Sequence, residues 1–420
     1  MRIRIIIMSF VLMAVLKNLH ASDRYVSLAG TNDFANKFTT WAGAATDIQW
    51  AVNFATNGEI VWVSNGTYYL TNQVYITNGI NLKSFSGSWT NTVVNGNNFS
   101  DKPVTNRCIY MTHAGAVVEG FTITNGFPGT NDQSGGGVFM TAGTLRDCLV
   151  TGNWVTNASS GGGVYAYCTA YAIITNCDFI GNWAHINGGG ASIGQIAQIW
   201  NCRFFHNRVL QNLVYNGGAG VYTLYSQSNC LNNSIMISNS AAYEGGGAMI
   251  QYPNNNCNVR HCLMAENYAG RGGGISFMHN NLTATNTMEN CTVASNRVGG
   301  IWRSYRGTSV FFNVISQSND SWQMSTSGGG FFCYHCSTIS NATMVFMDSG
   351  NITSPPAFAD FPGRDYRLSP DSPCANAGLN LPWMNFFTDL DGLSRIDKFS
   401  GRADMGCYEA HPRGVMFKAR

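Results

Sequence analysis

The stretch "AHINGGGASIGQIAQIWNCRFFHNRV", residues 184–209, decides the fold of this 420-residue chain. It combines a glycine triplet, Gly188–Gly190, with a cysteine, Cys202, in a segment that is poor in charge. A glycine triplet can cradle a phosphate, and a cysteine near His185 and His206 can hold a metal. Whether either interpretation holds depends on whether the arrangement occurs once or many times.

The arrangement recurs along most of the chain. Glycine clusters begin at positions 135, 161, 188, 217, 245, 272, 299 and 328. A second motif alternates with them, with cysteine first and asparagine last: "CLVTGN" at 148, "CDFIGN" at 177, "CRFFHN" at 202, "CLMAEN" at 262, "CTVASN" at 291 and "CSTISN" at 336. "SIMISN" at 234 and "VISQSN" at 314 lack the cysteine, and we interpret "FTITNG" at 121 as a copy one residue shorter. Self-similarity at this period indicates a solenoid or an array.

The repeat predicts β-strands. Apolar residues alternate with others, as in Cys148 and Val150 or Cys202 and Phe204, and glycine triplets would break helices. A repeat of about 28 residues with two or three short strands fits one coil of a parallel β-helix, whose coils stack at about 4.8 Å. The fold class is therefore an all-β, parallel β-helix solenoid with a short N-terminal capping helix and a small C-terminal module; its right-handed sense is what the family resemblance given below implies.

Equivalent positions in successive coils become neighbours in such a solenoid. The repeat cysteines form an inward stack, the glycines permit positive φ and close backbone approach at a corner, and the repeat asparagines form a ladder. The expected ladder residues are Asn153, Asn182, Asn207, Asn239, Asn267 and Asn296. We therefore interpret the repeated glycine, cysteine and asparagine as structural, because a phosphate loop or a metal site would not be copied along the chain.

The two ends differ from the middle. "ATDIQWAVNFATNG" predicts a helix with Ile48, Val52 and Ala55 on one face, Thr46 or Asp47 as its N-cap and Gly58 as its stop. It is followed by a buried strand, "EIVWV", and the helix is expected to plug the solenoid. We divide the chain into a signal peptide (1–21), an N-terminal cap with the first coils (22–104), regular repeats (105–345) and a C-terminal module (346–420).

Composition limits the possible partners. With 24 basic and 22 acidic residues, the net charge of +2 gives no electrostatic footprint for nucleic acid. Arg2 and Arg4, an apolar run from Ile5 to Leu16 and a small residue at Ala21 are typical of a secretory signal, with an uncleaved anchor as the alternative. The run is too short to span a bilayer, and we expect no transmembrane segment after signal removal. The expected location is secreted or on the cell surface, which the resemblances given below make a bacterial cell surface.

The repeats resemble right-handed parallel β-helix proteins of the pectate-lyase-like superfamily over roughly residues 25–345. "GGGV", "GGAG", "GGGA" and "GGGI", together with "FIGN" and "FFHN", also resemble the repeats of chlamydial polymorphic outer-membrane proteins. This resemblance implies the fold, but such repeats serve lyases, hydrolases, epimerases and adhesins alike.

The C-terminal region resembles a choice-of-anchor Q module of secreted bacterial β-helix proteins. The matching segments are "DYRLSPDSPCANAG" (365–378), "TDLDGLSRI" (388–396) and "GRADMGCYE" (401–409). The resemblance implies secretion, but the end "HPRGVMFKAR" lacks an apolar sorting tail. The 13 cysteines are an odd number, and a disulfide between Cys374 and Cys407 is left open. "DLDG" alone does not make a calcium loop, so we expect no metal site and no cofactor, with calcium the one possibility kept open.

Chemistry of the related enzymes needs carboxylates at matching positions on adjacent coils. The acids between 105 and 345 are Glu119, Asp132, Asp147, Asp178, Glu244, Glu266, Glu289 and Asp320, and no two share a repeat position on neighbouring coils. One pair of opposite charge, Asp178 and Arg203, does share a repeat position on neighbouring coils. Arg203 oriented by Asp178 is the weak catalytic candidate, and a cross-strand ion pair is the favoured interpretation. If the protein is an enzyme, the resemblance favours a polysaccharide lyase over a glycoside hydrolase.

The residue after each ladder asparagine suggests ligand binding. These residues are Trp154, Trp183, Arg208, Ser240, Tyr268 and Arg297, and the small or apolar residue that follows each is expected to point inward. An outward stripe of rings and guanidinium groups suits sugar faces, unless the preceding loops cover it; the nearby His185 and His206 are interpreted as ordinary surface. We therefore hypothesise binding of an extracellular polysaccharide or cell-surface component, with a non-enzymatic structural surface protein or adhesin as the alternative.

Overall fold

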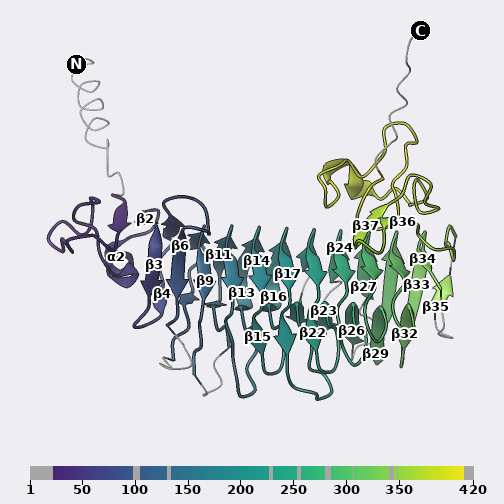
Figure 1. Cartoon of the computed structure of the whole chain (residues 1–420), viewed down its shortest axis with the longest axis horizontal. Helices are drawn as coiled ribbons and strands as arrows, with labels where there is room; N and C mark the ends of the chain where they lie inside the picture. Colours follow the sequence, from purple (N-terminus) through teal and green to yellow (C-terminus); the bar gives the residue numbers. More distant parts are fainter. Residues whose placement is uncertain are drawn as a thin grey trace, which may run out of the picture.

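The computed structural model describes residues 22–97, 105–129, 134–226, 230–252, 257–279, 285–305, 307–339, 345–347 and 349–410. The expected signal peptide, residues 1–21, and Asp132 lie outside these residues. The described chain forms a right-handed parallel β-helix whose coils stack along the long axis of the molecule (Figure 1). The predicted fold class is confirmed. Among the described residues, no helix has the length and apolar character needed to cross a membrane.

Parallel strands from successive coils make up three sheets. The long sheet contains β1 (Arg24–Val26), β2 (Ile60–Val63), β4 (Val74–Ile76), β5 (Asn81–Ser84), β7 (Ile109–Met111), β8 (Val117–Glu119), β10 (Val138–Met140), β11 (Gly143–Arg146), β13 (Val164–Thr175), β16 (Ala191–Trp200), β19 (Val221–Leu224), β20 (Leu231–Asn232), β23 (Ala248–Gln251), β24 (Asn258–Arg260), β26 (Ile275–His279), β27 (Thr285–Glu289), β29 (Ile301–Tyr305), β30 (Thr308–Phe312), β32 (Met324–Thr326), β33 (Gly330–Tyr334) and β35 (Val345–Met347).

The second sheet contains β3 (Gly66–Tyr69), β6 (Thr92–Asn95), β9 (Thr122–Thr124), β12 (Leu149–Thr151), β14 (Asp178–Ile180), β17 (Arg203–Phe205), β21 (Ile235–Ile237), β25 (Leu263–Ala265), β28 (Thr292–Ala294), β31 (Ile315–Gln317) and β34 (Ser337–Thr338). The short third sheet contains β15 (Trp183–Ala184), β18 (Arg208–Val209) and β22 (Ser240–Ala241). The opening stretch of sequence is thus one coil, which contributes β16, β17 and β18.

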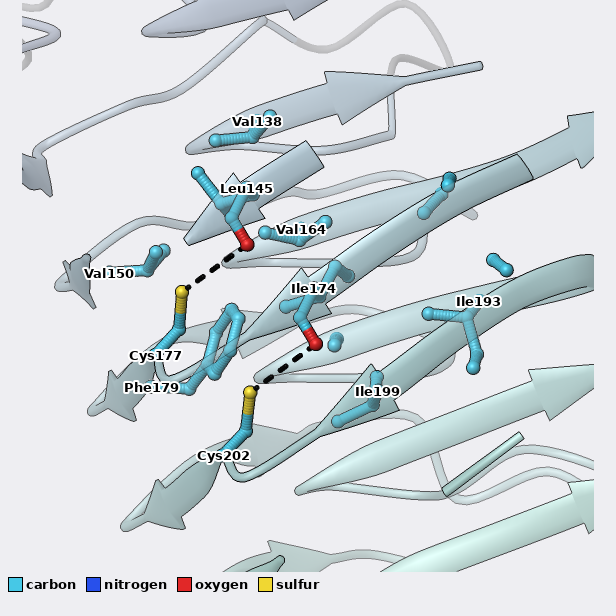
Figure 2. Packing of buried hydrophobic residues seen from close by; sticks show 14 of the residues in the cluster. Val138, Leu145, Val150, Val164, Ile174, Cys177, Phe179, Ile193, Ile199 and Cys202 are labelled. Carbon is cyan, nitrogen blue, oxygen red and sulfur yellow. Dashed lines mark hydrogen bonds between the residues drawn. The ribbon is translucent and has the colours of Figure 1, made fainter. Parts of the chain in front are cut away.

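The repeat cysteines lie in the core, as the alternation predicts. Cys148, Cys177 and Cys202 are fully buried in successive coils, and the Phe179 and Phe204 rings beside them stack with centroids 4.6 Å apart. The thiol of Cys177 donates to the carbonyl of Leu145 at 3.7 Å, as Figure 2 shows. Burial raises the pKa of the Cys177 thiol well above its ordinary value. These thiols are therefore inert packing groups rather than nucleophiles or metal ligands.

The predicted asparagine ladder is present and is longer than expected. The amide of each ladder residue donates to the amide oxygen of the next coil at 2.9–3.1 Å, from Asn153 to Asn319. The same oxygen also accepts the backbone N–H of the preceding ladder residue, as in Asn182 N to Asn207 Oδ1 at 3.0 Å. The amide of Asn319 ends the series by donating to Gln323 at 2.9 Å. Each side chain therefore satisfies backbone and amide groups that have no access to water.

The glycine triplets form a corner with no room for side chains. A Cβ atom on Gly189 would lie 2.5 Å from the carbonyl oxygen of Arg208, and Gly188 has a φ of 63°. Both observations explain why the corner needs glycine.

Strand register corrects one detail of the repeat. Ile123 of β9 pairs with Val150 of β12, so Phe121 is equivalent to Cys148 and Gly126 is equivalent to Asn153. The copy at 121 therefore has the full repeat length, with glycine at the ladder position. Gly126 N donates to Asn153 Oδ1 at 2.9 Å, which starts the ladder.

The N-terminal end carries the expected helix. α2 (Ile48–Phe54) begins after Asp47, whose side chain accepts the N–H of Gln49 at 2.7 Å. The helix ends before the predicted Gly58 stop, at Ala55. Ile48 and Val52 are buried with the strands of the first coils, and α2 lies at the N-terminal end of the solenoid in Figure 1.

The C-terminal segment packs on the outer face of the second sheet rather than extending the solenoid. It contains the antiparallel strands β36 (Phe358–Asp360) and β37 (Asp365–Leu368) and the short 3-10 helix η1 (Pro382–Phe386), and it lies beside the last coils (Figure 1). Cys407 packs against Leu263 and Ala294, whereas Cys374 packs against Ile315. Because they belong to different clusters, these two cysteines are separate buried thiols. The disulfide in the structure joins Cys230 to Cys257 on neighbouring coils.

Candidate functional site

The six residues that follow the ladder asparagines form one column. β15, β18 and β22 pair Trp183 with Arg208 and Arg208 with Ser240, and single bridges add Trp154, Tyr268 and Arg297 at the two ends. The residues that follow them point inward: Val209, Ala241 and Ala269 are buried in a small cluster of their own. The structure therefore brings together the residues that the sequence assigns to a stripe.

The rings of this column stack on one another. Trp154 lies between Phe127 and Trp183, with centroid distances of 3.9 Å and 4.8 Å and interplanar angles of 7° and 21°. Both faces of the Trp154 ring are therefore covered by protein. Phe127 directly follows Gly126 at the ladder position, and it joins the column because this copy of the repeat has the full length rather than the shorter one that the sequence suggests. A ligand can reach the Trp154 ring only at its edge.

Trp183 differs because the next residue in the column is Arg208 rather than an aromatic residue. Its ring contributes to a shallow pocket of about 340 Å³, lined by Gly181, Asn182, Trp183, His206, Arg208 and Leu210. Arg208 is exposed, and among the described residues it forms no ion pair. This pocket combines a half-buried indole with an exposed guanidinium group.

Tyr268 lies at the other end of the same part of the column. Its ring is 40% exposed, and the guanidinium of Arg297 lies 5.6 Å from its centroid. Its other neighbour in the column is Ser240, whose side chain is too small to cover a ring. Trp183 and Tyr268 therefore bracket a segment that contains Arg208 and Ser240. Asp320 follows Asn319, and its exposed carboxylate marks the C-terminal end of the column.

Asp178 and Arg203 form an ion pair on the second sheet. They are directly opposed on β14 and β17, with Nε to Oδ1 at 2.7 Å and a second bond at 2.5 Å. The hydrogen bond with Asp178 raises the pKa of Arg203 above its ordinary value. A guanidinium held this way does not give up a proton, so the geometry is that of a cross-strand ion pair.

Other carboxylates of the solenoid are also engaged. Glu119 is bonded to Lys83 and Arg146, Glu289 to Arg260, and Glu266 to Arg364 and Tyr366. Burial tends to raise the pKa of Glu119, but the hydrogen bonds from Lys83 and Arg146 outweigh it, and the pKa is lowered. These ion pairs are structural links between neighbouring segments of the chain.

Glu244 occupies a corner that sequence reasoning did not single out. Its side chain is buried, accepts from Ser276 at 2.9 Å and lies 4.0 Å from Arg271. Arg271 lies over the rings of Tyr243 and Trp302 at 5.3 Å and 5.2 Å. Burial raises the pKa of Glu244. The signal was an acid directly before a glycine triplet, but a carboxylate that is 1% exposed does not reach a bound chain.

His185 and the acidic loop make hydrogen bonds within the fold. His185 accepts the N–H of Ala158 at 3.1 Å, while His206 lies at the rim of the Trp183 pocket. Asp389 of "DLDG" accepts the N–H groups of Asp391, Leu393 and Glu409, so its oxygens are used within the turn. Within the described part of the chain, no group of three or more histidine, cysteine or acidic residues is arranged to hold a metal.

A second aromatic column was missed by sequence reasoning. Tyr75, Tyr110, Phe139 and Tyr165 stack on the outer face of the long sheet, with centroid distances of 4.7, 5.0 and 5.4 Å. Ring-on-ring stacking is thus a general stabilising device of this solenoid. Its signal was an aromatic residue shortly after several of the glycine clusters.

Comparisons with known proteins agree with the architecture. The profile of a family described as "Right handed beta helix region" matches residues 136–321. The crystal structure of pectate lyase Pel9A superposes with a TM-score of 0.56 at 14% identity and covers 93% of this chain and 98% of that chain. A complex of XylC with xylose gives a TM-score of 0.42 at 9% identity, covering 80% and 87%. A search of curated proteins finds no match to the chain. The family profile and the superposition on pectate lyase Pel9A show that the chain has the pectate-lyase-like β-helix fold.

Proposed function

We propose that this chain is a secreted or surface-exposed bacterial β-helix protein that binds an acidic extracellular polysaccharide at the segment between Trp183 and Tyr268. The observation that carries this proposal is the Trp183 ring, which lies in an open pocket beside Arg208. That combination is absent at Trp154, whose ring is covered on both faces.

The chemistry of the pocket suits a sugar that carries a carboxylate. The C–H face of a pyranose packs on an indole, as other apolar surfaces do, and an exposed guanidinium binds a carboxylate through two parallel hydrogen bonds. Arg208 has no carboxylate partner within the described residues, so binding would not require breaking an existing ion pair. Asn182, the ladder residue directly before Trp183, fixes the local backbone through the hydrogen bond of its amide to Asn207.

The arrangement of carboxylates supports binding more than cleavage. Elimination or hydrolysis needs an accessible acid or base next to the substrate. Asp320 is exposed, but it lies at the end of the column beyond Arg297; the acids Glu119, Asp178, Glu244 and Glu289 are held by arginine, lysine or serine. We therefore place binding first and leave a lyase-like reaction to direct measurement.

The test titrates the protein with polyuronate oligosaccharides and measures binding by tryptophan fluorescence and calorimetry. We expect Trp183→Ala and Arg208→Gln each to weaken binding about tenfold, the effect of losing about 1.4 kcal/mol. Trp154→Ala is the matched control, because it removes an indole whose faces do not meet solvent; it should change affinity less than about threefold. Ultraviolet absorbance of unsaturated products, with and without calcium, is recorded in the same samples.

Two outcomes of the titration would contradict the proposal. If no acidic or neutral polysaccharide binds across the panel, the proposal is wrong and a structural role of the solenoid as a surface stalk is favoured. If Trp154→Ala and Trp183→Ala weaken binding equally, the ligand does not use the Trp183 pocket.

A further inference from the structure

A second pocket lies where the C-terminal segment meets the solenoid, away from the column described above. It has a volume of about 290 Å³ and is lined by Trp200, Asn201, Asn232, Asn233, Arg260, His261, Trp383, Phe386, Phe387 and Thr388. Four of these residues come from η1 and its C-terminal end, and the other six from the ends of solenoid strands. The pocket therefore needs both the C-terminal segment and the solenoid.

The floor of this pocket is part of a second ladder. The residue before the cysteine position of the repeat has left-handed backbone, with φ of 53° at Asn176 and Asn201 and 46° at Asn233, which precedes Ser234. Amides at this position bond along the column, as in Asn176 to Asp147 at 3.2 Å and Asn233 to Asn201 at 2.6 Å. Asparagine is favoured there because it tolerates this conformation.

The ladder is interrupted at His261. An asparagine amide at this position would donate to Asn233 Oδ1, but the imidazole does not, and among the described residues neither Asn233 Oδ1 nor His261 Nε2 has a hydrogen-bond partner. His261 is 4% exposed. A native structure seldom leaves two buried polar atoms unpaired on adjacent coils, which points to a missing partner.

Beyond the break, the same ladder holds the C-terminal segment. Asn313 exchanges two hydrogen bonds with the backbone of Leu379, at 2.8 Å and 2.7 Å, and Asn290 donates to the carbonyl of Asp404 at 3.2 Å. The ladder thus binds peptide groups where the segment covers it. At Asn201 and Asn233 the C-terminal segment does not cover the ladder. The ladder amides there can form the same kinds of hydrogen bond.

Aromatic rings surround the unpaired atoms. Trp383 lies 4.7 Å from the His261 ring and is covered on one side by Arg260 at 5.4 Å. Trp200 and Phe387 are nearly parallel, with their centroids 6.5 Å apart. Phe386 is 84% exposed at the rim, an unusual position for a large apolar side chain.

The pocket carries no unbalanced charge. Arg260 is paired with Glu289 at 2.7 Å. Burial, together with the charges of Arg395 and Arg260, lowers the pKa of His261 to about 3, so the imidazole is neutral at physiological pH. A neutral ligand therefore fits better than a uronate.

We infer that this pocket binds one neutral pyranose residue, with the sugar ring between Trp200 and Trp383 and its hydroxyls on the amide and imidazole left unpaired at the break in the ladder. A hydroxyl both donates and accepts, so it matches an amide oxygen and either tautomer of a neutral imidazole. The volume is near the lower limit for small-molecule sites, which fits one or two sugar units rather than a long chain. This site is separate from the proposed polysaccharide surface and does not depend on it.

The test uses the full chain and neutral tetrasaccharides of glucose, xylose, mannose and galactose, with binding followed by saturation-transfer NMR and calorimetry. At least one sugar should bind, and Trp383→Ala and Asn233→Ala should each weaken it about tenfold. Two matched controls should change affinity less than about twofold. Phe399→Ala removes an aromatic ring that is 89% exposed outside this pocket, and Asn176→Ala removes an amide from the same ladder.

His261→Asn separates a binding role from a structural one. Completing the ladder should raise the melting temperature, because the unpaired oxygen of Asn233 gains a donor, and should weaken sugar binding by a similar factor of about ten. The inference is overturned if no sugar of the panel binds, if the controls weaken binding as much as the pocket variants, or if His261→Asn leaves affinity unchanged. Trp183→Ala should leave this binding intact, so failure here and failure of the polysaccharide proposal are distinguishable.

Discussion

At the scale of the residue, side-chain amides determine how the solenoid meets its hydrogen-bonding needs. A turn buried between two coils leaves N–H and C=O groups that water cannot reach, and each ladder asparagine supplies both a donor and an acceptor to them. Asn207 accepts from the backbone and the amide of Asn182 and donates to Asn239 and to the carbonyl of Phe179. The ladder is therefore a stability element rather than a site.

Replacing Asn207 by alanine should lower the free energy of unfolding by about 3 kcal/mol, because several buried groups lose their partners at once. Urea denaturation followed by circular dichroism measures the change. Asn176→Ala is the control: its side chain is exposed, and the expected loss is no more than about 1 kcal/mol, from its left-handed backbone. A loss below about 1 kcal/mol for Asn207→Ala would show that water or backbone rearrangement replaces the ladder.

His261 should make stability depend on pH. Its folded pKa is lowered from the ordinary 6.5 to about 3, chiefly by burial and also by Arg395 and Arg260. The unfolded chain takes up a proton below about pH 6.5 and the folded chain does not, so stability is lost as pH falls from 6.5 toward 3.

Melting temperatures of the wild type and His261→Asn, measured from about pH 7 to about pH 4, should therefore diverge as the pH falls. The wild type should lose more stability, since other titrating groups are common to both proteins. His206→Asn, at an exposed histidine, should follow the wild-type curve. Parallel curves for the wild type and His261→Asn would contradict the buried neutral imidazole.

At the scale of the element, each coil depends on a glycine corner that has no tolerance for a methyl group. A Cβ on Gly189 would meet the backbone of Arg208 at 2.5 Å and of Ala219 at 2.8 Å. Gly181 has a left-handed φ of 63°, which Gly189 does not, yet nothing lies within 4 Å of its added Cβ. The two positions separate close packing from backbone conformation.

Gly189→Ala should therefore lower the free energy of unfolding by about 3 kcal/mol or more, because backbone must move on two coils. Gly181→Ala should cost only about 1 kcal/mol, the penalty of a left-handed alanine. Thermal and urea denaturation of both variants give the comparison. A loss at Gly189→Ala no larger than the loss at Gly181→Ala would show that the neighbouring coils move apart to accept the methyl group.

Much at this scale was predictable from the sequence. Repetition alone indicated the coil, the inward cysteines, the ladder and the column from Trp154 to Arg297, because a solenoid converts sequence period into spatial neighbours. The orientation of the rings was not predictable. Phe127 and Trp183 cover the Trp154 ring because of their side-chain χ angles, which the repeat does not determine. The pocket near Trp383 was also beyond the sequence, since it forms between segments more than 100 residues apart, where no period applies.

At the scale of the whole molecule, the two aromatic surfaces differ in charge. The column presents Arg208 and Arg297 to solvent, whereas the pocket near Trp383 holds a paired Arg260 and a neutral His261. Exposed charges are screened at a Debye length of about 10 Å in 0.1 M salt, and contacts between neutral groups are not. Salt therefore distinguishes the two proposed sites in one protein.

Raising sodium chloride from about 0.05 M to about 0.5 M should weaken binding of a polyuronate severalfold, while the affinity for a neutral tetrasaccharide changes less than about twofold. Calorimetry on the wild type measures both. In Arg208→Gln the polyuronate should bind more weakly and its remaining affinity should depend less on salt, because the variant lacks the charge that is screened. Salt-independent polyuronate binding would place the acidic chain elsewhere on the molecule. Equal salt dependence of both ligands would show that they share one charged surface.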